Sequence, residues 1–313
     1  MNNFRPETWA EYFGQKKIIQ NLKVFVNSAI KQKKVLDHIV ISGPSGMGKT
    51  SLAFLLAKIL KVKMHYLNGP SLQKQSDLVS VLSFIKENDI LFIDEVHALS
   101  KELLEVLYPI LEDGKLNVII GKEYNSKIIN LKIPDFTLIV ATTEISRLAD
   151  PFLNRFPIKF ELDNYNLNEI EDLIMINAQK LNLNFAPACS KILANHSRST
   201  PRIAINLLKR INDFVINDDK DLVDEKYLRD ILHRMEIYPK GLILNDIKYL
   251  NYLNSHKILG LNNMSQYLNL NQDHILHFIE PLLIRNSFII RTPKGRVITE
   301  QGIEYIKNIS YLK

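Results

Sequence analysis

The stretch "DHIVISGPSGMGKTSLAFLLAKIL", residues 37–60, decides the fold class of this chain. An apolar run precedes "GPSGMGKT", residues 43–50, which matches the pattern G-x-x-x-x-G-K-[ST], and a helical pattern follows it. This order predicts a strand, a loop whose backbone N–H groups surround phosphate oxygens, and a helix with its positive end toward them. Lys49 is then expected to reach the β- and γ-phosphates of a nucleotide, and the Thr50 hydroxyl to bind Mg²⁺.

Strand-like and helix-like patterns alternate as far as about residue 160. The runs "DILFIDE", residues 89–95, and "DFTLIVATTE", residues 135–144, are so apolar that they predict a parallel sheet covered by helices on both faces. Four amphipathic helical patterns follow, and then "SFIIRTPKGRVITE", residues 287–300, in which a Pro-Lys-Gly turn joins two strand-like runs. We therefore expect an α/β P-loop sheet domain over residues 1–163, an all-α helical domain over 164–238 and a winged-helix domain over 239–313.

Composition limits the class of protein. Hydrophobic residues make up 46% of the 313 residues and charged residues 24%, which is ordinary for a globular chain. The single cysteine, Cys189, excludes an internal disulfide framework and fits a reducing compartment. The sequence has no run of 18 apolar residues and does not begin with a basic-then-apolar leader. We therefore expect a cytoplasmic protein without a membrane segment.

The net charge of +6 is concentrated toward the C-terminus. From Lys240 onward nine Lys and Arg stand against five Asp and Glu, a net charge of +4. This excess favours a C-terminal module that faces phosphates, although an evenly solvated basic face would have the same composition.

Polar residues end two of the apolar runs. "ILFIDE" ends in Asp94 and Glu95, where a carboxylate beside a phosphate loop is expected to contact Mg²⁺ and a second one to orient or deprotonate the attacking water. His97 follows, and either couples the site to a partner or is a capping or surface histidine. "LIVATTE" includes Thr142 and Thr143, which could sense the γ-phosphate or simply finish a strand.

A further cation follows these runs, in "DPFLNRFP", residues 150–157. Phosphoryl transfer develops charge on the γ-phosphoryl oxygens, and an arginine finger contributes roughly 10³–10⁵ in rate, about 4–7 kcal/mol of barrier. An exposed ion pair is worth only about 0–1 kcal/mol. Arg155 is therefore a surface charge, half of a salt bridge, or half of an active site whose other half lies on another copy of the chain.

With these motifs the chain resembles, nearly end to end, the RuvB family of bacterial Holliday-junction branch-migration motors, which are AAA+ ATPases. "STPRIAINLLKRINDF" is one of the matching segments, and the more specific ones are "RPETWAEYFGQ", "LYPILED" and "RTPKGR". The resemblance implies an AAA+ P-loop ATPase domain, a helical lid and a DNA-binding winged helix, in a subunit that hydrolyses ATP to drive branch migration in recombination and DNA repair.

The resemblance also implies site residues at matching positions. Arg155 would enter the neighbouring subunit's site, Thr143 would sense the γ-phosphate, and Arg202 would act as a second sensor from the lid of its own subunit. The catalytic set would be Lys49, Asp94, Glu95, Thr143, Arg155 and Arg202, with Thr50 and Asp94 on Mg²⁺. The residues around ATP would be Phe4, Arg5, Gly46, Gly48, Lys49, Thr50, Ser51, Glu112, Asp113, Tyr165 and Arg202.

Three partners are implied as well: duplex DNA of Holliday-junction arms, further copies of the chain in a homo-hexameric ring, and a junction-binding partner of the RuvA type. The hairpin over about residues 115–133 would dock that partner. The winged helix would contact DNA phosphates through Arg291, Lys294 and Arg296.

The sequence departs from the family pattern at three positions. Leu153 and Pro157 stand where the family usually reads arginine and glycine, next to Arg155. Gln272 stands where an arginine is expected at the start of the recognition helix, which predicts one phosphate contact fewer and a salt dependence flatter by about one unit of slope.

Two other functions share parts of this pattern. An ATP-switched loader or initiator would use the same phosphate loop, lid and C-terminal DNA-binding domain. It would use ATP to assemble a complex and would hydrolyse little ATP continuously. A scaffold that only binds ATP is disfavoured by the intact set of Lys49, Asp94, Glu95, Arg155 and Arg202.

Overall fold

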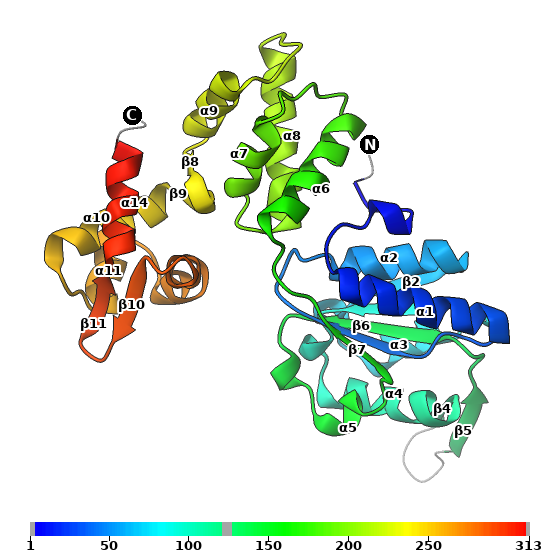
Figure 1. Ribbon diagram of the computed structural model, residues 1–313. Coiled ribbons are helices and arrows are strands. Elements are labelled where there is room, and N and C mark those ends of the chain that lie inside the picture. Colours follow the sequence, from blue (N-terminus) through cyan, green and yellow to red (C-terminus); the bar gives the residue numbers. More distant parts are fainter. Residues whose placement is uncertain (1–3, 121–126, 311–313) are drawn as a thin grey trace. The chain divides into compact units, whose positions relative to one another are not determined.

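The computed structural model describes residues 4–120 and 127–310, and the chain divides into two compact units, residues 1–166 and 167–313. The first unit is built on a five-stranded parallel sheet with the strand order β2-β3-β6-β1-β7 (Figure 1). Its strands are β1 Ile39–Ser42, β2 Met64–Asn68, β3 Ile90–Asp94, β6 Thr137–Thr142 and β7 Ile158–Glu161. Because β6 lies between β1 and β3, the ends of all three strands meet at one edge of the sheet.

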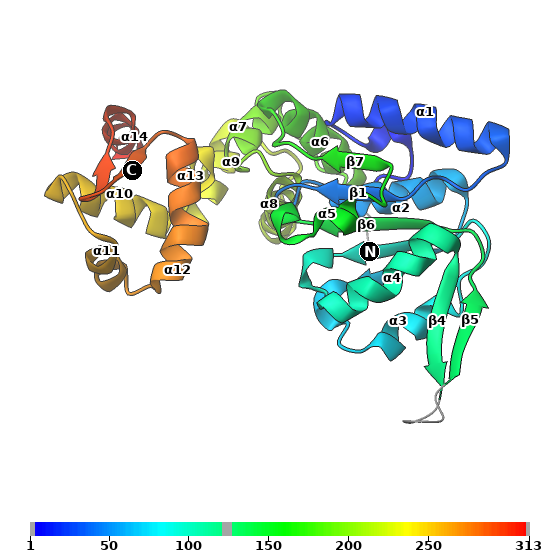
Figure 2. The ribbon, with the colours of Figure 1, turned by 90° about the horizontal axis from the view of Figure 1, so that it is seen from below.

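Helices cover both faces of this sheet, α1 and α2 on one side and α3 and α4 on the other (Figures 1 and 2). Alternate residues of the strands, such as Val40, Leu91 and Leu138, pack into one buried cluster with Leu78 of α3 and Leu107 of α4. The predicted covering of apolar strands on both faces is therefore confirmed. The helices are α1 Lys16–Gln32, α2 Lys49–Leu60, α3 Gln75–Leu82, α4 Lys101–Asp113 and the short α5 Asp150–Leu153.

A two-stranded hairpin follows α4 and projects beyond the sheet (Figure 2). Gly114 ends the helix at a φ of 63°, and β4 Lys115–Ile120 then pairs antiparallel with β5 Lys127–Lys132. The strands thus form within the predicted hairpin 115–133, while its residues 121–126 lie outside the described residues.

The second unit begins with four helices, as the sequence predicts. They are α6 Leu167–Lys180, α7 Cys189–Asn195, α8 Pro201–Asn217 and α9 Glu225–Arg234. Cys189 is buried at the start of α7, where its thiol contacts the carbonyl oxygen of Val223.

The remainder of the second unit is a small winged-helix fold around a core of its own, which includes Leu250, Met264, Ile275 and Leu283. β8 Ile237–Tyr238 and β9 Leu242–Ile243 flank the turn η6 Pro239–Gly241. The helices are α10 Leu244–His256, α11 Leu261–Leu268, α12 Gln272–His274, the π-helix η7 Ile275–Ile279, α13 Glu280–Arg285 and α14 Glu300–Ser310, and the wing is β10 Ile289–Thr292 paired with β11 Gly295–Ile298.

The expected succession of sheet, helical and winged-helix folds is confirmed. Within residues 4–120 and 127–310, no helix combines the length and apolarity needed to cross a bilayer.

Candidate nucleotide site

The phosphate loop connects β1 to α2, as predicted, and its glycines take conformations that other residues avoid. Gly46 and Gly48 have φ values of 83° and 100°. A Cβ atom on Gly48 would lie 2.9 Å from the Tyr12 hydroxyl, and one on Gly43 would lie 2.6 Å from the Leu162 carbonyl oxygen. The loop therefore needs glycine both for its turn and for its close contacts with Tyr12 and Leu162.

Lys49 is the first residue of α2 and is almost fully buried in this loop. Its Nζ donates to the carbonyl oxygens of Gly43, at 2.7 Å, and Pro44, at 3.1 Å. A buried ammonium group beside exposed helix N–H groups makes a strong site for an anion. These residues fit the phosphates of a nucleotide.

Thr50 and Asp94 meet at the edge of the sheet. The Thr50 hydroxyl donates to Asp94 Oδ2 at 2.8 Å, and Asp94 Oδ1 accepts from the Glu95 backbone at 3.1 Å. A hydroxyl and a carboxylate oxygen are ligands that Mg²⁺ accepts, usually together with substrate phosphates. No cluster of three His, Cys, Asp or Glu side chains with metal-binding geometry occurs among the described residues.

Glu95 is held by the end of the neighbouring strand β6. Its Oε2 accepts from the Thr143 backbone N–H at 3.1 Å and from the Thr143 hydroxyl at 3.0 Å. Its backbone is left-handed, with φ of 49°, an unfavourable conformation of a kind that concentrates at functional sites. Gly69 permits it, because a Cβ atom at Gly69 would lie 2.4 Å from the Glu95 carbonyl oxygen. The carboxylate is therefore anchored beside the expected γ-phosphate sensor.

His97, whose role the sequence left open, belongs to the same group of side chains. Its Nδ1 lies 2.9 Å from Thr142 Oγ1 and 3.3 Å from Glu95 Oε2, and its Nε2 lies 3.5 Å from Glu144 Oε1. Only 11% of its side chain is exposed, so it is not a surface histidine. It links the carboxylate on β3 to the end of β6.

Two tyrosines support the phosphate loop from behind. The Tyr165 hydroxyl donates to the Met47 carbonyl oxygen at 3.3 Å, and the Tyr12 hydroxyl lies 3.5 Å from the Gly48 carbonyl oxygen. Burial, and then the neighbouring Tyr165, raise the pKa of Tyr12 well above its ordinary value. Tyr12 was missed from the sequence, although it lies in the matching segment "RPETWAEYFGQ".

Near the N-terminus, the Arg5 guanidinium lies over the Phe54 ring of α2, 3.8 Å from its centroid. Phe4, its neighbour, is partly buried, and Ser51 lies in the first turn of α2.

Arg155 lies directly after α5 and is held by its own chain. Its Nη2 donates to Glu112 Oε1 at 2.5 Å, its Nη1 donates to the Pro151 carbonyl oxygen, and its guanidinium lies 4.4 Å from the Tyr108 ring centroid. Its Nε atom is buried without a hydrogen-bond partner in the described part of the chain. Glu112, expected near a nucleotide, thus contacts the expected arginine finger, and Asp113 lies 4.0 Å from Lys115.

The two departures beside Arg155 fit this arrangement. Leu153 packs against the core of the sheet domain, and Phe152 and Phe156 are buried with their rings 5.0 Å apart. Pro157 is exposed before β7. The segment around Arg155 is therefore held by apolar contacts, including those of Leu153, the position at which the family pattern has an arginine.

In the second unit, Arg202, the expected second sensor, is the second residue of α8.

The candidates for DNA binding lie on the wing. Arg291 Nε donates to Glu280 Oε2 at 2.5 Å, and Arg296 Nε donates to Glu280 Oε1 at 2.8 Å. Glu280 is completely buried, whereas Arg291 is 46% and Arg296 only 15% exposed. Lys294 is exposed at the turn between β10 and β11.

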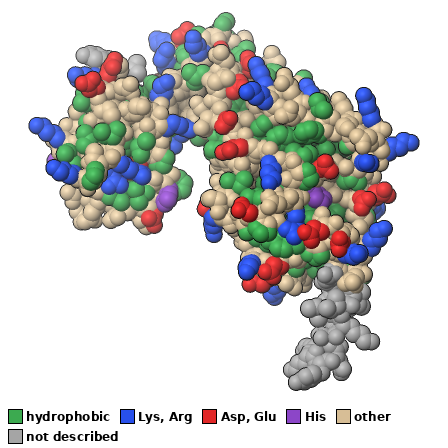
Figure 3. All heavy atoms as spheres, turned by 60° about the horizontal axis from the view of Figure 1, so that its bottom comes forward, with side chains coloured by type: hydrophobic (Ala, Val, Ile, Leu, Met, Phe, Trp, Pro, Cys, Tyr) green, Lys and Arg blue, Asp and Glu red, His purple; other side chains and the backbone are tan. Residues whose placement is uncertain are grey.

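Lys and Arg side chains gather with apolar ones on the face of the winged-helix part seen in Figure 3. Gln272 is exposed at the start of α12, and the π-helix that follows it is a rare conformation often found at functional sites.

A phosphate loop on β1, a carboxylate pair on β3 and a polar strand end between them define a P-loop ATPase, and with the helical part that follows it is of the AAA+ class. Models of three RuvB domains match the chain: the Holliday junction DNA helicase RuvB P-loop domain over residues 4–162, the RuvB AAA lid domain over 165–238 and the RuvB C-terminal winged helix domain over 239–307. The chain belongs to the RuvB family, as its sequence motifs indicated.

Relatives match over nearly the full length. The chain is 40% identical to the Holliday junction branch migration complex subunit RuvB of Mycoplasmopsis pulmonis, covering 97% of this chain and 98% of that one. It is 38% identical to the subunit of the same name from Ehrlichia ruminantium, covering 99% and 94%. The solved structure of the Thermotoga maritima RuvB Holliday junction branch migration motor superposes with a TM-score of 0.81 at 32% identity, covering 97% and 98%.

Proposed function

We propose that this chain is the ATP-hydrolysing subunit of a Holliday-junction branch-migration motor. The observation that carries the proposal is the contact group at the edge of the sheet: Lys49 in the loop, Thr50 on Asp94, and Glu95 on Thr143. This group supplies a cation for phosphates, a pair of Mg²⁺ ligands and a carboxylate for the attacking water. Membership of the RuvB family supports the substrate, a DNA junction.

Each residue has a role that its surroundings support. Lys49 and the loop N–H groups bind the β- and γ-phosphates of ATP. Thr50 and Asp94 hold Mg²⁺, which would offset the charge on those phosphates. Glu95 orients the attacking water and accepts its proton, and Thr143 positions Glu95.

Arg155 completes the site of the adjacent subunit in a ring, which we propose is a homo-hexamer. Within one chain its guanidinium pairs with Glu112 on α4. That pair is partly exposed, so its stabilisation is about 0–1 kcal/mol and can be exchanged for a γ-phosphate. Glu112 and Asp113 would come to the neighbour's nucleotide together with Arg155, and Arg202 would act as a sensor from the lid.

The remaining parts of the chain connect ATP hydrolysis to the DNA and to a partner. The three domains extend over residues 1–163, 164–238 and 239–313, and the winged helix contacts the phosphates of duplex DNA through Arg291, Lys294 and Arg296. A RuvA-type partner docks on the hairpin over residues 115–133. Since bacterial chromosomes lie in the cytoplasm, the protein would act there. Phosphate contacts suit a motor, because it must move along any sequence.

The test combines two inactive variants, Lys49→Ala and Arg155→Ala. If the arginine acts across an interface, a mixed ring contains some sites with both an intact loop and an intact arginine. ATP hydrolysis should then partly return when the variants are mixed. Failure to recover activity, with both variants folded and assembled, would count against a shared site. Continuous DNA-stimulated hydrolysis with branch migration separates the motor from an ATP-switched loader.

A further inference from the structure

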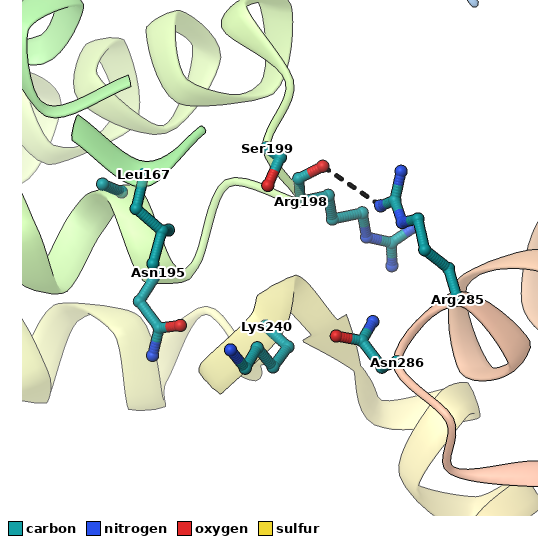
Figure 4. A pocket seen from close by; sticks show the side chains of 8 residues that line it. Leu167, Asn195, Arg198, Ser199, Lys240, Arg285 and Asn286 are labelled. Carbon is teal, nitrogen blue, oxygen red and sulfur yellow. Dashed lines mark hydrogen bonds between the residues drawn. The ribbon is translucent and has the colours of Figure 1, made fainter. Parts of the chain in front are cut away.

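A cationic pocket lies within the second unit, away from the residues assigned above. It opens between the turn after α7, the turn η6 and the end of α13 (Figure 4). Its volume is about 100 Å³, enough for several water molecules. Three cations, Arg198, Lys240 and Arg285, line it, and none of the described side chains in its wall is a carboxylate.

Arg198 is fixed in place by the winged-helix part. Its Nε donates to the Gly241 carbonyl oxygen at 2.7 Å, and its Nη2 donates to Asp246 Oδ2 at 3.1 Å. Asp246 is almost completely buried and does not line the pocket. Asp246 offsets the charge of Arg198. The wall remains positively charged because of Lys240 and Arg285.

Arg285 approaches Arg198 rather than avoiding it. Its Nη2 donates to the Arg198 carbonyl oxygen at 3.1 Å, so that the two guanidinium groups lie on the same side of the pocket (Figure 4). Burial, and then the charge of Arg198, lower the pKa of Arg285. Lys240 makes neither a hydrogen bond nor an ion pair within the residues that the structure describes, and its side chain is exposed. An anion would relieve the repulsion among these groups.

The backbone of the pocket is strained. Arg198, Ser199 and Lys240 have φ values of 55°, 54° and 64°, although none is glycine. Gly241 permits this arrangement, because a Cβ atom there would lie 2.4 Å from Arg198 Cγ. Left-handed residues of this kind persist where the surroundings enforce them, often at ligand sites.

The wall also offers neutral donors. The Ser199 hydroxyl and the Asn195 and Asn286 amides line the pocket, and one Asn286 N–H is already used by the Leu282 carbonyl oxygen. Guanidinium groups bind two oxygens of a phosphate in parallel, and an ammonium group adds a point charge. We propose that this pocket binds a phosphate oxyanion, either a phosphodiester of the DNA backbone or a free phosphate group.

The first arm of the test measures duplex DNA binding by the full chain across a range of salt concentrations. Each phosphate neutralised contributes about 0.9 to the slope of log affinity against log salt. Lys240→Gln and Arg285→Gln should each flatten the slope by about one unit if the ligand is DNA. Lys307→Gln, which removes an exposed charge from α14 in the same unit, should leave it unchanged. A circular dichroism spectrum equal to that of the wild-type chain shows that each variant is folded.

The second arm uses inorganic phosphate with the nucleotide site saturated by ADP. Phosphate at constant ionic strength should raise the Tm of the wild-type chain but not of the Lys240→Gln/Arg285→Gln double variant, since a ligand stabilises only the state that binds it. This result with an unchanged salt slope assigns the pocket to a free anion. Unchanged slopes and no phosphate-dependent difference in Tm overturn the proposal.

Only the DNA arm rests on the proposed function. If the wild-type chain does not bind duplex DNA at all, that function fails, and the thermal arm alone decides whether the pocket binds an anion.

Discussion

Replacing the buried Glu280 with glutamine should strongly destabilise the winged helix. The carboxylate is completely buried and accepts from Arg291, Arg296 and the Tyr249 hydroxyl, the last at 3.0 Å. Glutamine keeps the shape but removes the charge and directs an N–H group toward donors. The Arg296 bond is worth about 1.5–3 kcal/mol because it is charged and mostly buried, and the exposed Arg291 adds about 0–1 kcal/mol. Together with Tyr249, the expected loss is about 3 kcal/mol.

Amide hydrogen exchange measures this loss in the intact chain. A change of about 3 kcal/mol corresponds to roughly a hundredfold faster exchange in β10, β11 and α10, the elements around Glu280. Amides of β1 and β3, in the other unit, should not change. Glu304→Gln, an exposed acid on α14, serves as the matched control and should alter exchange by less than about threefold. If Glu280→Gln behaves like this control, the buried carboxylate does not stabilise the wing.

Three further predictions concern the sheet domain. Thr50→Val removes the hydroxyl that contacts Asp94 and should both lower ATP hydrolysis and raise the Mg²⁺ concentration needed, whereas an unchanged Mg²⁺ titration would contradict the assignment. Glu95→Gln should still bind ATP but hydrolyse it roughly 10²–10⁴ times more slowly in single-turnover measurements, and wild-type turnover would exclude Glu95 as the base. Burial lowers the pKa of His38 from 6.5 to about 4, so the folded state takes up its proton later than the unfolded state as the pH falls. Stability should therefore fall by up to about 3 kcal/mol between pH 6.5 and pH 4; His38→Asn, which can still accept from the Leu138 N–H, should flatten the acid-unfolding curve, and an equally steep curve would refute the explanation.

Much of the nucleotide site was predictable because its signals are local. The phosphate loop, Lys49 and Thr50 occupy consecutive positions between a strand and a helix, so spacing alone indicates their geometry. Asp94 ends the apolar strand β3 and Thr143 follows the apolar strand β6, and parallel strands bring their ends to one edge. His97 remained ambiguous, since Thr142 and Glu144, which it contacts, lie 45 and 47 residues further along the chain.

On the wing, the sequence did not reveal the partners of the charged side chains. It predicts that Arg291 and Arg296 contact phosphates, and it indicates no partner for them within the chain. In the structure both donate to one carboxylate that lies 11 and 16 residues earlier in the chain. No periodicity or motif indicates that Glu280 is buried, because its burial follows from how α13 packs beneath the wing.

The amino-acid sequence by itself determined the class of this protein: strand, phosphate loop and helix in order, apolar strands that require two covered faces, and motifs shared along the whole chain with one family. Only the tertiary structure decided the partners of its charged side chains, such as Glu112 with Arg155 and Asp246 with Arg198. The physical reason is range. Backbone conformation and apolar patterning are written in neighbouring residues, whereas a charge is stabilised or exposed by groups that the fold brings from distant parts of the chain.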